Sequence, residues 1–393
     1  MTSNWKTCQL GELVTFTSGG TPSKKNEEYW NGTIPWISAK TMKDEHISTS
    51  DLMISEEGLK NGSRLAPEGS ILFLIRGSGL FNGIPICLVD KPVAFNQDVK
   101  CINSCTEIEN KYIFYWLLSQ SSTLSAMVGV TTIGAGKFDM DVIKRLEITY
   151  PEKDVRDEII RIADAISDKI RLNTVINENL MLQAQCVFAE EFLSFDVLPD
   201  GWKKSSLLGI ADYLNGLAMQ KYRPNDDEQG LPVLKIKELR QGCCDTNSEL
   251  CSPSIKSEYI VHDGDVIFSW SGSLLVDLWC GGTCGLNQHL FKVTSSSYDK
   301  WFYYAWTNHH LQKFAAIAAD MATTMGHIKR EELAKAEVLI PTQADYDRIG
   351  SVLAPIYELV ISNRIENRKL ASLRDELLPR LMSGDIDVSE VMI

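Results

Sequence analysis

Long apolar runs are missing from this 393-residue sequence. No stretch of about 18 apolar residues occurs, so we expect no transmembrane helix. The first residues, Met1 to Lys6, lack the apolar core of a signal peptide. The ten cysteines do not follow the spacing of zinc ligands, which predicts no metal site and favours reduced thiols. Together these absences predict a cytoplasmic protein.

Catalytic motifs are missing as well. An amino-methyltransferase carries an Asn/Asp-Pro-Pro-Tyr loop, yet the sequence has no Asn-Pro or Asp-Pro dipeptide. Gly134–Phe138 comes nearest to a phosphate loop, but it lacks both the first glycine and the hydroxyl residue after Lys137. The single Glu-x-Lys triplet, Glu109–Lys111, opens a predicted helix and is weak evidence for a nuclease. We therefore predict no catalytic residue in this chain.

The charge is acidic, with a formal net charge of −13, which argues against indiscriminate binding to nucleic acid. The acidity is highest per residue in two segments predicted to be helical. The two larger segments, residues 1–150 and 199–340, are nearly balanced. A balanced domain can still present a basic face, so the charge leaves DNA binding open.

The sequence does contain a repeat of its own first half. Trp202-Lys203 follows Trp5-Lys6 by 197 residues, and this spacing falls to 190 in a helical stretch further on. The other recurring pairs are Ser18-Gly19 with Asn215-Gly216, Ile34–Ile37 with Leu231–Leu234, Gly69–Phe73 with Gly264–Phe268, Phe95-Asn96-Gln97 with Leu286-Asn287-Gln288, and Thr131–Gly134 with Thr323–Gly326. A repeat of this length consists of whole domains. Two related domains are suited to binding two related targets.

Each half opens with a domain of mixed α and β character, over residues 1–150 and 200–340. Short apolar runs bounded by Gly, Pro and Asn, such as Ile71–Ile75 and Val266–Phe268, predict buried strands. Aromatic-rich stretches at Tyr112–Leu118 and Trp301–Trp306 predict helices. We expect their aromatic side chains in the core, with stacking on bases as the alternative.

A long helix is predicted after each domain, over residues 151–193 and 341–382, and a tail follows at 383–393. Pro151 and the acidic Glu152 and Asp154 mark a helix start. Apolar residues then recur at close to heptad spacing, which predicts that the two helices pack as an antiparallel coiled coil. The expected seam residues are Ile159, Ile162, Ile166, Ile170, Asn173, Leu180, Ile349, Val352, Ile356, Val360, Asn363 and Leu370. Asn173 and Asn363 either fix the register inside this seam or face solvent.

The duplicated order of these features resembles the specificity subunit of a Type I restriction–modification system over essentially the whole chain. The residues that carry the resemblance are Trp5-Lys6, Leu10–Leu13, Gly19–Ser23, Tyr29-Trp30, Ile34–Ile37, Phe95–Gln97 and the closing Leu377–Asp387. The second domain departs from the pattern, with Met219–Tyr222 where the first has its Gly-Thr-Pro-Ser turn. Such a departure would suit a different half of the target.

The resemblance implies an α+β fold: two similar mixed α/β target-recognition domains, separated and followed by long helices that pack as an antiparallel coiled coil, with a pseudo-twofold internal repeat. It implies a non-catalytic subunit in which each domain reads one half of a bipartite site in double-stranded DNA and the helix pair sets the spacing. Its implied partners are two methyltransferase subunits, which bind S-adenosylmethionine. Two restriction/translocase subunits, which use ATP and Mg, can join this complex. This chain itself is expected to bind no cofactor.

Residues suited to DNA contact recur at equivalent places in both domains. Cationic and hydroxyl side chains bind phosphates, and Arg, Lys, Asn, Gln, Ser or Thr read base edges. The candidates in the first domain are Ser18, Thr21, Ser23, Lys24, Lys25, Lys40, Thr41, Arg76, Ser78, Thr131, Thr132 and Lys137. Those in the second are Gln220, Lys221, Tyr222, Arg223, Lys237, Arg240, Ser271, Ser273, Thr323, Thr324, His327 and Lys329. Each could instead belong to a solvated turn or a helix cap.

The repeated Asn-Gln dipeptides, Asn96-Gln97 and Asn287-Gln288, are expected to be buried amides that hold each domain together rather than base readers. Two further classes of function stay open. One is an enzyme, either a fused methyltransferase–nuclease or a nuclease with a cryptic site. The other is a coiled-coil interaction protein, whose binding would ignore duplex sequence and salt, whereas phosphate contacts weaken as salt rises.

Overall fold

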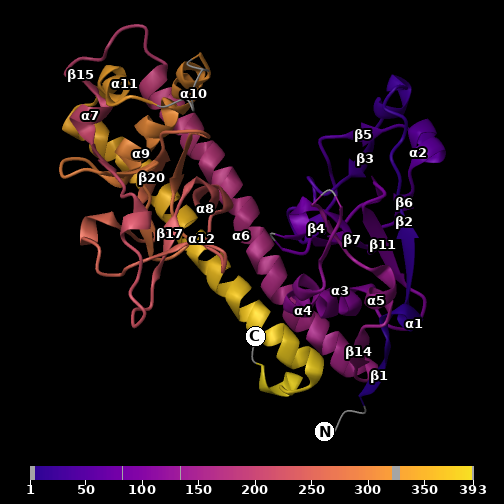
Figure 1. The fold of residues 1–393 in the computed structure, drawn as a ribbon. Helices are drawn as coiled ribbons and strands as arrows, with labels where there is room; N and C mark the ends of the chain where they lie inside the picture. Colours follow the sequence, from indigo (N-terminus) through magenta and orange to yellow (C-terminus); the bar gives the residue numbers. More distant parts are fainter. Residues whose placement is uncertain (1–4, 82, 133, 321–327, 392–393) are drawn as a thin grey trace. The chain divides into compact units, whose positions relative to one another are not determined.

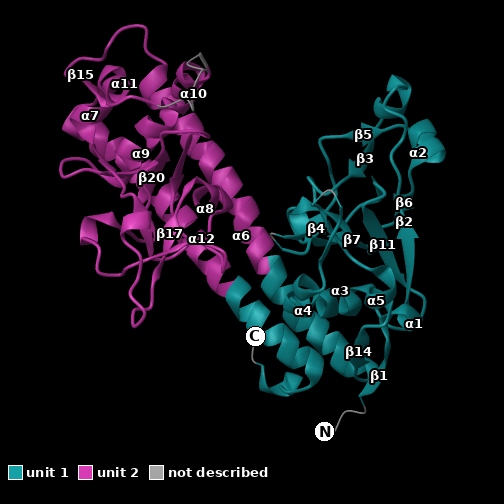
Figure 2. Cartoon of the chain, in the orientation of Figure 1, with its two compact units in different colours: residues 1–168, 371–393 teal, residues 169–370 magenta. Residues whose placement is uncertain are grey.

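The computed structural model describes residues 5–81, 83–132, 134–320 and 328–391 (Figure 1). The chain forms two compact units, one made of Met1–Asp168 with Ala371–Ile393 and the other of Lys169–Leu370 (Figure 2). Each unit therefore contains one sheet-rich domain and a portion of both long helices. Among the described residues, no helix is long and apolar enough to span a membrane.

The first unit is built on a five-stranded sheet in the order β2-β11-β7-β9-β4. Every residue of β7 and β9 is buried, as expected for continuous apolar runs in the middle of a domain. Its strands are β2 (Val14–Ser18), β4 (His46–Ile47), β7 (Ile71–Leu74), β9 (Ile86–Val89) and β11 (Val99–Ser104). The predicted strand over Ile71–Ile75 is thus confirmed as β7.

Three smaller sheets complete this unit, in the orders β5-β3-β10-β6, β12-β13-β8 and β1-β14. Their strands are β1 (Lys6–Gln9), β3 (Ile34–Ile37), β5 (Met53–Ile54), β6 (Leu65–Ala66), β8 (Arg76–Gly77), β10 (Val93–Phe95), β12 (Gly129–Val130), β13 (Gly136–Lys137) and β14 (Glu147–Tyr150). The helices are α1 (Leu10–Leu13), η1 (Glu27–Trp30), α2 (Glu56–Gly62), η2 (Ser78–Leu80), α3 (Asn110–Ser119), α4 (Ser121–Ala126) and α5 (Met140–Lys144). Residues Tyr112 to Leu117 of α3 are all buried, so its aromatics belong to the core, as predicted.

The second unit repeats this plan. Its larger sheet has the order β16-β23-β20-β21, and its smaller ones are β18-β17-β22-β19 and β15-β24. The strands are β15 (Lys203–Ser206), β16 (Asp212–Asn215), β17 (Leu231–Leu234), β18 (Leu250–Cys251), β19 (Ile260–Val261), β20 (Val266–Ser269), β21 (Leu275–Leu278), β22 (Cys284–Leu286), β23 (Leu290–Thr294) and β24 (Glu337–Ile340). A parallel pair joins β3 to β10 in one unit and β17 to β22 in the other. The predicted internal repeat is therefore confirmed at the level of strand order.

The helices of the second unit follow the same plan. They are α7 (Leu207–Ile210), η3 (Met219–Lys221), α8 (Ile236–Gln241), η4 (Ser257–Tyr259), α9 (Lys300–His309), α10 (Leu311–Asp320) and α11 (Arg330–Lys335). Helix α9 corresponds to α3, and its residues Trp301 to Thr307 are buried. Its aromatic side chains are packed in the core, as predicted.

The two long helices are α6 (Lys153–Leu193) and α12 (Gln343–Ser383), and the short η5 (Val388–Glu390) follows α12. Each long helix has 41 residues, which corresponds to about 60 Å at the usual rise. In the second unit they run antiparallel, because Asn177 contacts Asn363 while the later Glu191 contacts the earlier Arg348. The predicted fold class, with its antiparallel helix pair, is confirmed.

Most of the predicted seam is buried. Ile159, Ile162, Ile166, Asn173, Ile349, Val360 and Asn363 are buried, and Ile170, Leu180, Ile356 and Leu370 are partly buried. The prediction that Val352 lies in the seam was wrong. Its side chain is 47% exposed, and the neighbouring Leu353 is fully buried instead. The reason is that this part of α12 packs on its own domain as well as on α6. Leu353 and Tyr357 share a core cluster with Trp301 and Tyr304 of α9, which turns Val352 away.

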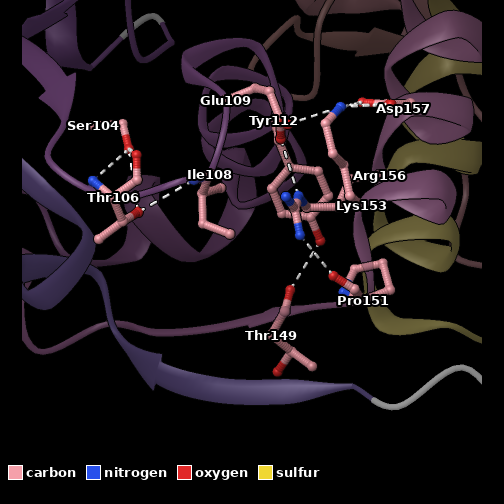
Figure 3. A network of polar contacts seen from close by, with 10 residues as sticks. All are labelled: Ser104, Thr106, Ile108, Glu109, Tyr112, Thr149, Pro151, Lys153, Arg156 and Asp157. Carbon is pink, nitrogen blue, oxygen red and sulfur yellow. Dashed lines mark hydrogen bonds and ion pairs between the residues drawn. The ribbon is translucent and has the colours of Figure 1, made fainter.

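The start of α6 is tied to the first domain by one arginine, Arg156, whose side chain is 4% exposed. Figure 3 shows it between the carboxylate of Glu109 and the carbonyl of Pro151, to which it donates hydrogen bonds of 2.9 and 3.0 Å. Burial by itself would raise the pKa of Glu109, but the hydrogen bond and charge of Arg156 and the nearby charge of Lys153 lower it. Beside them, the Tyr112 hydroxyl donates to the carbonyl of Thr149. The Arg156 contacts tie α6 to the residue before α3 and to the residue after β14, and the Tyr112 bond joins α3 to β14.

Candidate nucleic-acid interface

One edge of the main sheet gathers several of the predicted DNA contacts in the first unit. Strands β2 and β7 both run antiparallel to β11, with Ser18 opposite Lys100 and Leu74 opposite Val99. The carboxyl ends of β2 and β7 therefore meet the amino end of β11 at the same edge. We call this region the polar edge, made of residues 18–21, 76–78, 96–98 and 136–137. Its counterpart in the second unit consists of residues 215–218, 271–273 and 287–289, at the same ends of β16, β20 and β23.

A buried asparagine turn organises each polar edge. Asn96 is 7% exposed. Its side-chain Oδ1 accepts a hydrogen bond from the backbone N–H of Asp98 at 3.0 Å, and its backbone N–H donates to the carbonyl of Ile37 at 2.9 Å. In the second unit, Asn287 is also 7% exposed, accepts from the amide of His289 and donates to Leu234, both at 3.2 Å. The prediction that these two asparagines are buried structural amides is confirmed.

Glycine is required where the first strand of each domain passes this turn. A Cβ atom on Gly19 would lie 2.2 Å from the carbonyl oxygen of Phe95, and one on Gly216 would lie 2.3 Å from that of Asn287. Such distances are far inside van der Waals contact, so only glycine lets the backbones approach this closely. The recurrence of Ser/Asn-Gly in the sequence reflects this packing.

The glutamine that follows each asparagine was predicted to be buried, and neither glutamine is. Gln97 is exposed rather than buried, and Gln288 is partly buried. The Thr21 hydroxyl donates to Oε1 of Gln97 at 2.6 Å, and Nε2 of Gln97 faces the carboxylate of Asp98 at 3.4 Å. The amide of Gln97 is thus oriented at the surface. Its burial was inferred from the sequence because the dipeptide recurs, yet only the asparagine carries the shared turn.

Two cations lie side by side at the polar edge of the first unit. Arg76 of β8 pairs in register with Lys137 of β13, and both are exposed. Like charges directly opposite each other destabilise a ladder. The carboxylate of Asp98 lies 4.0 Å from the guanidinium of Arg76. The hydroxyl of Thr131 closes the adjoining turn by accepting from the amide of Ala135. This pair of cations is suited to hydrogen-bond acceptors such as phosphate oxygens and base edges.

The remaining candidates of the first unit are mostly exposed. Ser18, Ser23, Lys24, Lys25, Lys40, Ser78 and Thr132 are exposed, and the Ser18 hydroxyl accepts from the ammonium of Lys100. In the part of the chain that the structure describes, no carboxylate lies within ion-pair distance of Lys24, Lys25 or Lys40, so these lysines are available to phosphates. Thr41 instead closes a local turn, since its hydroxyl donates to the carbonyl of Ser38 at 2.8 Å.

Most described candidates of the second unit are exposed, and two of its cations are paired with carboxylates. Gln220, Lys221, Tyr222, Arg223, Lys237, Arg240, Ser273 and Lys329 are exposed. Arg223 lies 3.1 Å from Glu249, and Lys237 lies 3.2 Å from Asp245. A hydrogen bond from Lys235, together with the charge of Arg223, lowers the pKa of Glu249, which keeps this carboxylate ionised. Thr323, Thr324 and His327 lie outside the described residues.

Ser271 is the candidate that the structure removes. It is 2% exposed, and its hydroxyl lies 3.2 Å from Nδ1 of His289. The indole ring of Trp270 lies beside this histidine, with ring centroids 6.1 Å apart. A buried hydroxyl cannot reach a ligand directly. His289 was missed because the recurring motif ends at the Asn-Gln dipeptide. The next residue differs between the domains: it is Asp98 in the first and His289 in the second.

Both polar edges present polar groups on backbone turns. Both have amide and hydroxyl groups, and the polar edge of the first unit adds the cations Arg76 and Lys137, whereas that of the second unit contains no Lys or Arg. Among the described residues, no group of three or more His, Cys, Asp or Glu side chains is placed to hold a metal ion. Hydrogen-bond donors and acceptors of this kind are what base edges and phosphates require.

Comparison with known proteins gives a consistent result. The family model for the Type I restriction modification DNA specificity domain matches residues 2–182 and again 199–373. The chain is 24% identical over 416 aligned positions to the Type I restriction enzyme MjaIX specificity subunit of Methanocaldococcus jannaschii, covering 99% of this chain and 95% of that protein. It is 34% identical over 162 positions to the EcoR124I/EcoR124II specificity subunit of Escherichia coli, covering 41% and 40%. The crystal structure of the Type-I system S subunit from M. genitalium shares the fold, with a TM-score of 0.56 at 13% identity over 97% of this chain and 96% of that one.

Proposed function

The chain belongs to the family of Type I restriction–modification DNA specificity proteins, and from this premise we propose that it is the sequence-recognition subunit of such a complex, without catalytic residues of its own. The observation that carries the proposal is the duplicated polar edge. The same asparagine turn, in the same strand setting, occurs once in each domain. Each domain would read one half of a bipartite site in double-stranded DNA.

The helix pair would set the distance between the half-sites. Amides of three buried asparagines and the partly buried Asn367 would fix its register, since Asn363 donates to Asn177 and Asn173 donates to Asn367, each at 2.9 Å. Polar pairs inside an apolar seam favour one register over its neighbours, because a slipped pairing would leave the amides without partners. A fixed register gives a fixed spacer length.

The outer face of α6 would dock a methyltransferase subunit. Leu172, Val175, Leu182 and Leu193 are between 46% and 59% exposed, and Cys186 beside them is exposed too. Their spacing of three, four or seven residues places them along one side of the helix, opposite the buried Asn173 and Asn177. An exposed apolar stripe at heptad spacing is typical of a helix that packs against a helix of a partner protein.

The full complex would contain two methyltransferase subunits, in keeping with the pseudo-twofold repeat of this chain. S-adenosylmethionine would be bound by those subunits, and ATP and Mg by two restriction/translocase subunits where these are present. This chain would contribute the recognition of DNA and the scaffold, and would bind no cofactor.

Mapping methylated adenines across the host genome, with and without this gene, tests the proposal. The expected result is the loss of one split motif, in which two short defined parts flank an unspecified spacer. If the cognate methyltransferase is expressed and no modification changes, the specificity function is rejected. The competing interaction-protein function then predicts binding to other proteins and no salt-dependent binding to duplex DNA.

A further inference from the structure

The internal repeat shows where the two polar edges differ. Leu74 pairs with Val99 in the first unit, and Ser269 pairs with Leu290 in the second. Counting from these pairs, Arg76 is equivalent to Ser271. By the same count, Asp98 is equivalent to His289. The neighbouring strands and the asparagine turn are shared, but the side chains are not, and Arg76 is exposed whereas Ser271 is buried.

The contact between the two positions is kept while its chemistry changes. A guanidinium faces a carboxylate at 4.0 Å in the first unit, and a hydroxyl faces an imidazole at 3.2 Å in the second. Both pairs occur beside the same asparagine turn, so this turn does not dictate which pair is present. Two domains that bind different half-sites must differ somewhere on a common scaffold. This pair, directly beside the shared asparagine turn, is such a place.

Arg76 has the exposure and the free donors that a base reader needs. Its side chain is 54% exposed, against 27% for Asp98. A guanidinium has five N–H donors. Among the described residues, its ion pair is with Asp98 at 4.0 Å, which leaves most of those donors free. Lys137, directly across the ladder, adds positive charge at the same place.

The difference between the domains favours a base over a phosphate as the partner of Arg76. Phosphate contacts carry no sequence information, so two domains on the same duplex have no reason to differ at a phosphate site. Arginine pairs bidentately with O6 and N7 of guanine in the major groove, which is the commonest specific contact of this side chain. The second domain presents His289 and the adjacent Gln288 there instead.

We propose that Arg76 reads a guanine in the half-site of the first domain, that Asp98 positions its guanidinium, and that His289 takes this place in the second domain. The inference rests on the proposed function, because it assigns one base of the bipartite site to one side chain. It predicts a guanine requirement at one position of a single half-site.

The test uses the complex of the full-length chain with its methyltransferase subunits. Methylation rates are measured on duplexes carrying the wild-type motif and on duplexes substituted at each position of both half-sites. Arg76→Lys keeps the charge but loses the bidentate fork. It is expected to lower the preference for guanine at one position by about 10- to 100-fold and to leave the other half-site unchanged. Asp98→Asn is expected to weaken the same preference without lowering overall affinity, because it removes an anion.

Lys25→Ala is the matched control, since it removes an exposed lysine of the same domain. It should lower affinity for all duplexes alike and leave the motif unchanged. The proposal is overturned if Arg76→Lys keeps the wild-type base preference, or if it lowers methylation uniformly as the control does. A wild-type complex that methylates no split motif would count against the proposed function instead, which separates the two failures.

Discussion

Asn363 donates a hydrogen bond of 2.9 Å to Oδ1 of Asn177 on the antiparallel helix, and both residues are at most 9% exposed. Asn173 makes the same bond to Asn367. The repeat of 190 residues converts one pair into the other, because it takes Asn173 to Asn363 and Asn177 to Asn367. The pseudo-twofold symmetry of the sequence is thus expressed as two copies of one polar contact.

Asn177→Ala should lower the free energy of unfolding of the second unit by about 1–3 kcal/mol, because it leaves the buried amide of Asn363 without a partner. Replacing both residues by leucine should recover most of this loss, since no unpaired polar group then remains. Denaturant unfolding of the single and double variants measures both effects. Asn179→Ala, an exposed asparagine on the same helix, is the control and should change stability by less than about 0.5 kcal/mol. If the double leucine variant were no more stable than Asn177→Ala, the pairing of the two asparagines would be contradicted.

The seam illustrates what heptad spacing can and cannot predict. Asn173 and Asn363 were expected either in the seam or in solvent, and both are buried. Their partners, Asn177 and Asn367, were missed because a spacing pattern identifies the buried side of a helix and not the residue that it meets. Val352 was misplaced for a related reason, since α12 also packs on α9, and a contact with a domain does not follow heptads.

Arg156→Ala should destabilise the first unit by about 1–3 kcal/mol, because it leaves the carbonyl of Pro151 without its buried donor and leaves Glu109 with the more exposed Lys153 as its remaining cation. Thermal or denaturant unfolding measures the loss. Arg161→Ala is the matched control on the same helix: its pair with Glu158 is exposed and should contribute no more than about 1 kcal/mol. Equal effects of the two substitutions would show that Arg156 does not anchor α6.

The second unit should lose stability as the pH falls below the ordinary histidine range. His310 is 7% exposed, and its Nε2 lies 2.8 Å from the carbonyl of Glu337. Burial lowers the pKa of His310 below its ordinary value of 6.5. The unfolded chain then takes up the proton first, so this stability is complete above about pH 6.5 and is lost as the pH falls through the folded pKa.

Urea midpoints measured between about pH 7 and pH 5 check this expectation. His310→Gln should flatten the decline, because glutamine does not titrate and its amide can still donate to Glu337. His262→Gln, an exposed histidine of the same unit, is the control. If the slope of the His310 variant equals that of the wild type, the proton taken up on unfolding belongs to another group.

The polar edge was predicted in part. The sequence placed Ser18, Thr21, Arg76 and Lys137 among the candidates, because cations and hydroxyls followed apolar strands in both halves. It could not show that these segments meet at one sheet edge, since strand order is a property of the tertiary fold. Gln97 and Ser271 were placed wrongly because exposure is decided by neighbouring turns. The sequence did contain one signal of the difference between the two edges. The residue after the recurring Asn-Gln dipeptide is Asp98 in the first domain and His289 in the second.

Leu172→Glu combined with Leu182→Glu should abolish co-purification of this chain with its methyltransferase subunit, because two carboxylates would then have to be desolvated in an apolar contact. These side chains are 55% and 59% exposed, so the fold and the helix content should be retained. Gln183→Glu with Gln185→Glu is the matched control, since it adds the same charge to exposed positions on either side of the stripe. Analytical ultracentrifugation of mixtures measures the association. Were the leucine and glutamine variants to bind the methyltransferase equally well, the outer face of α6 would not be its docking surface.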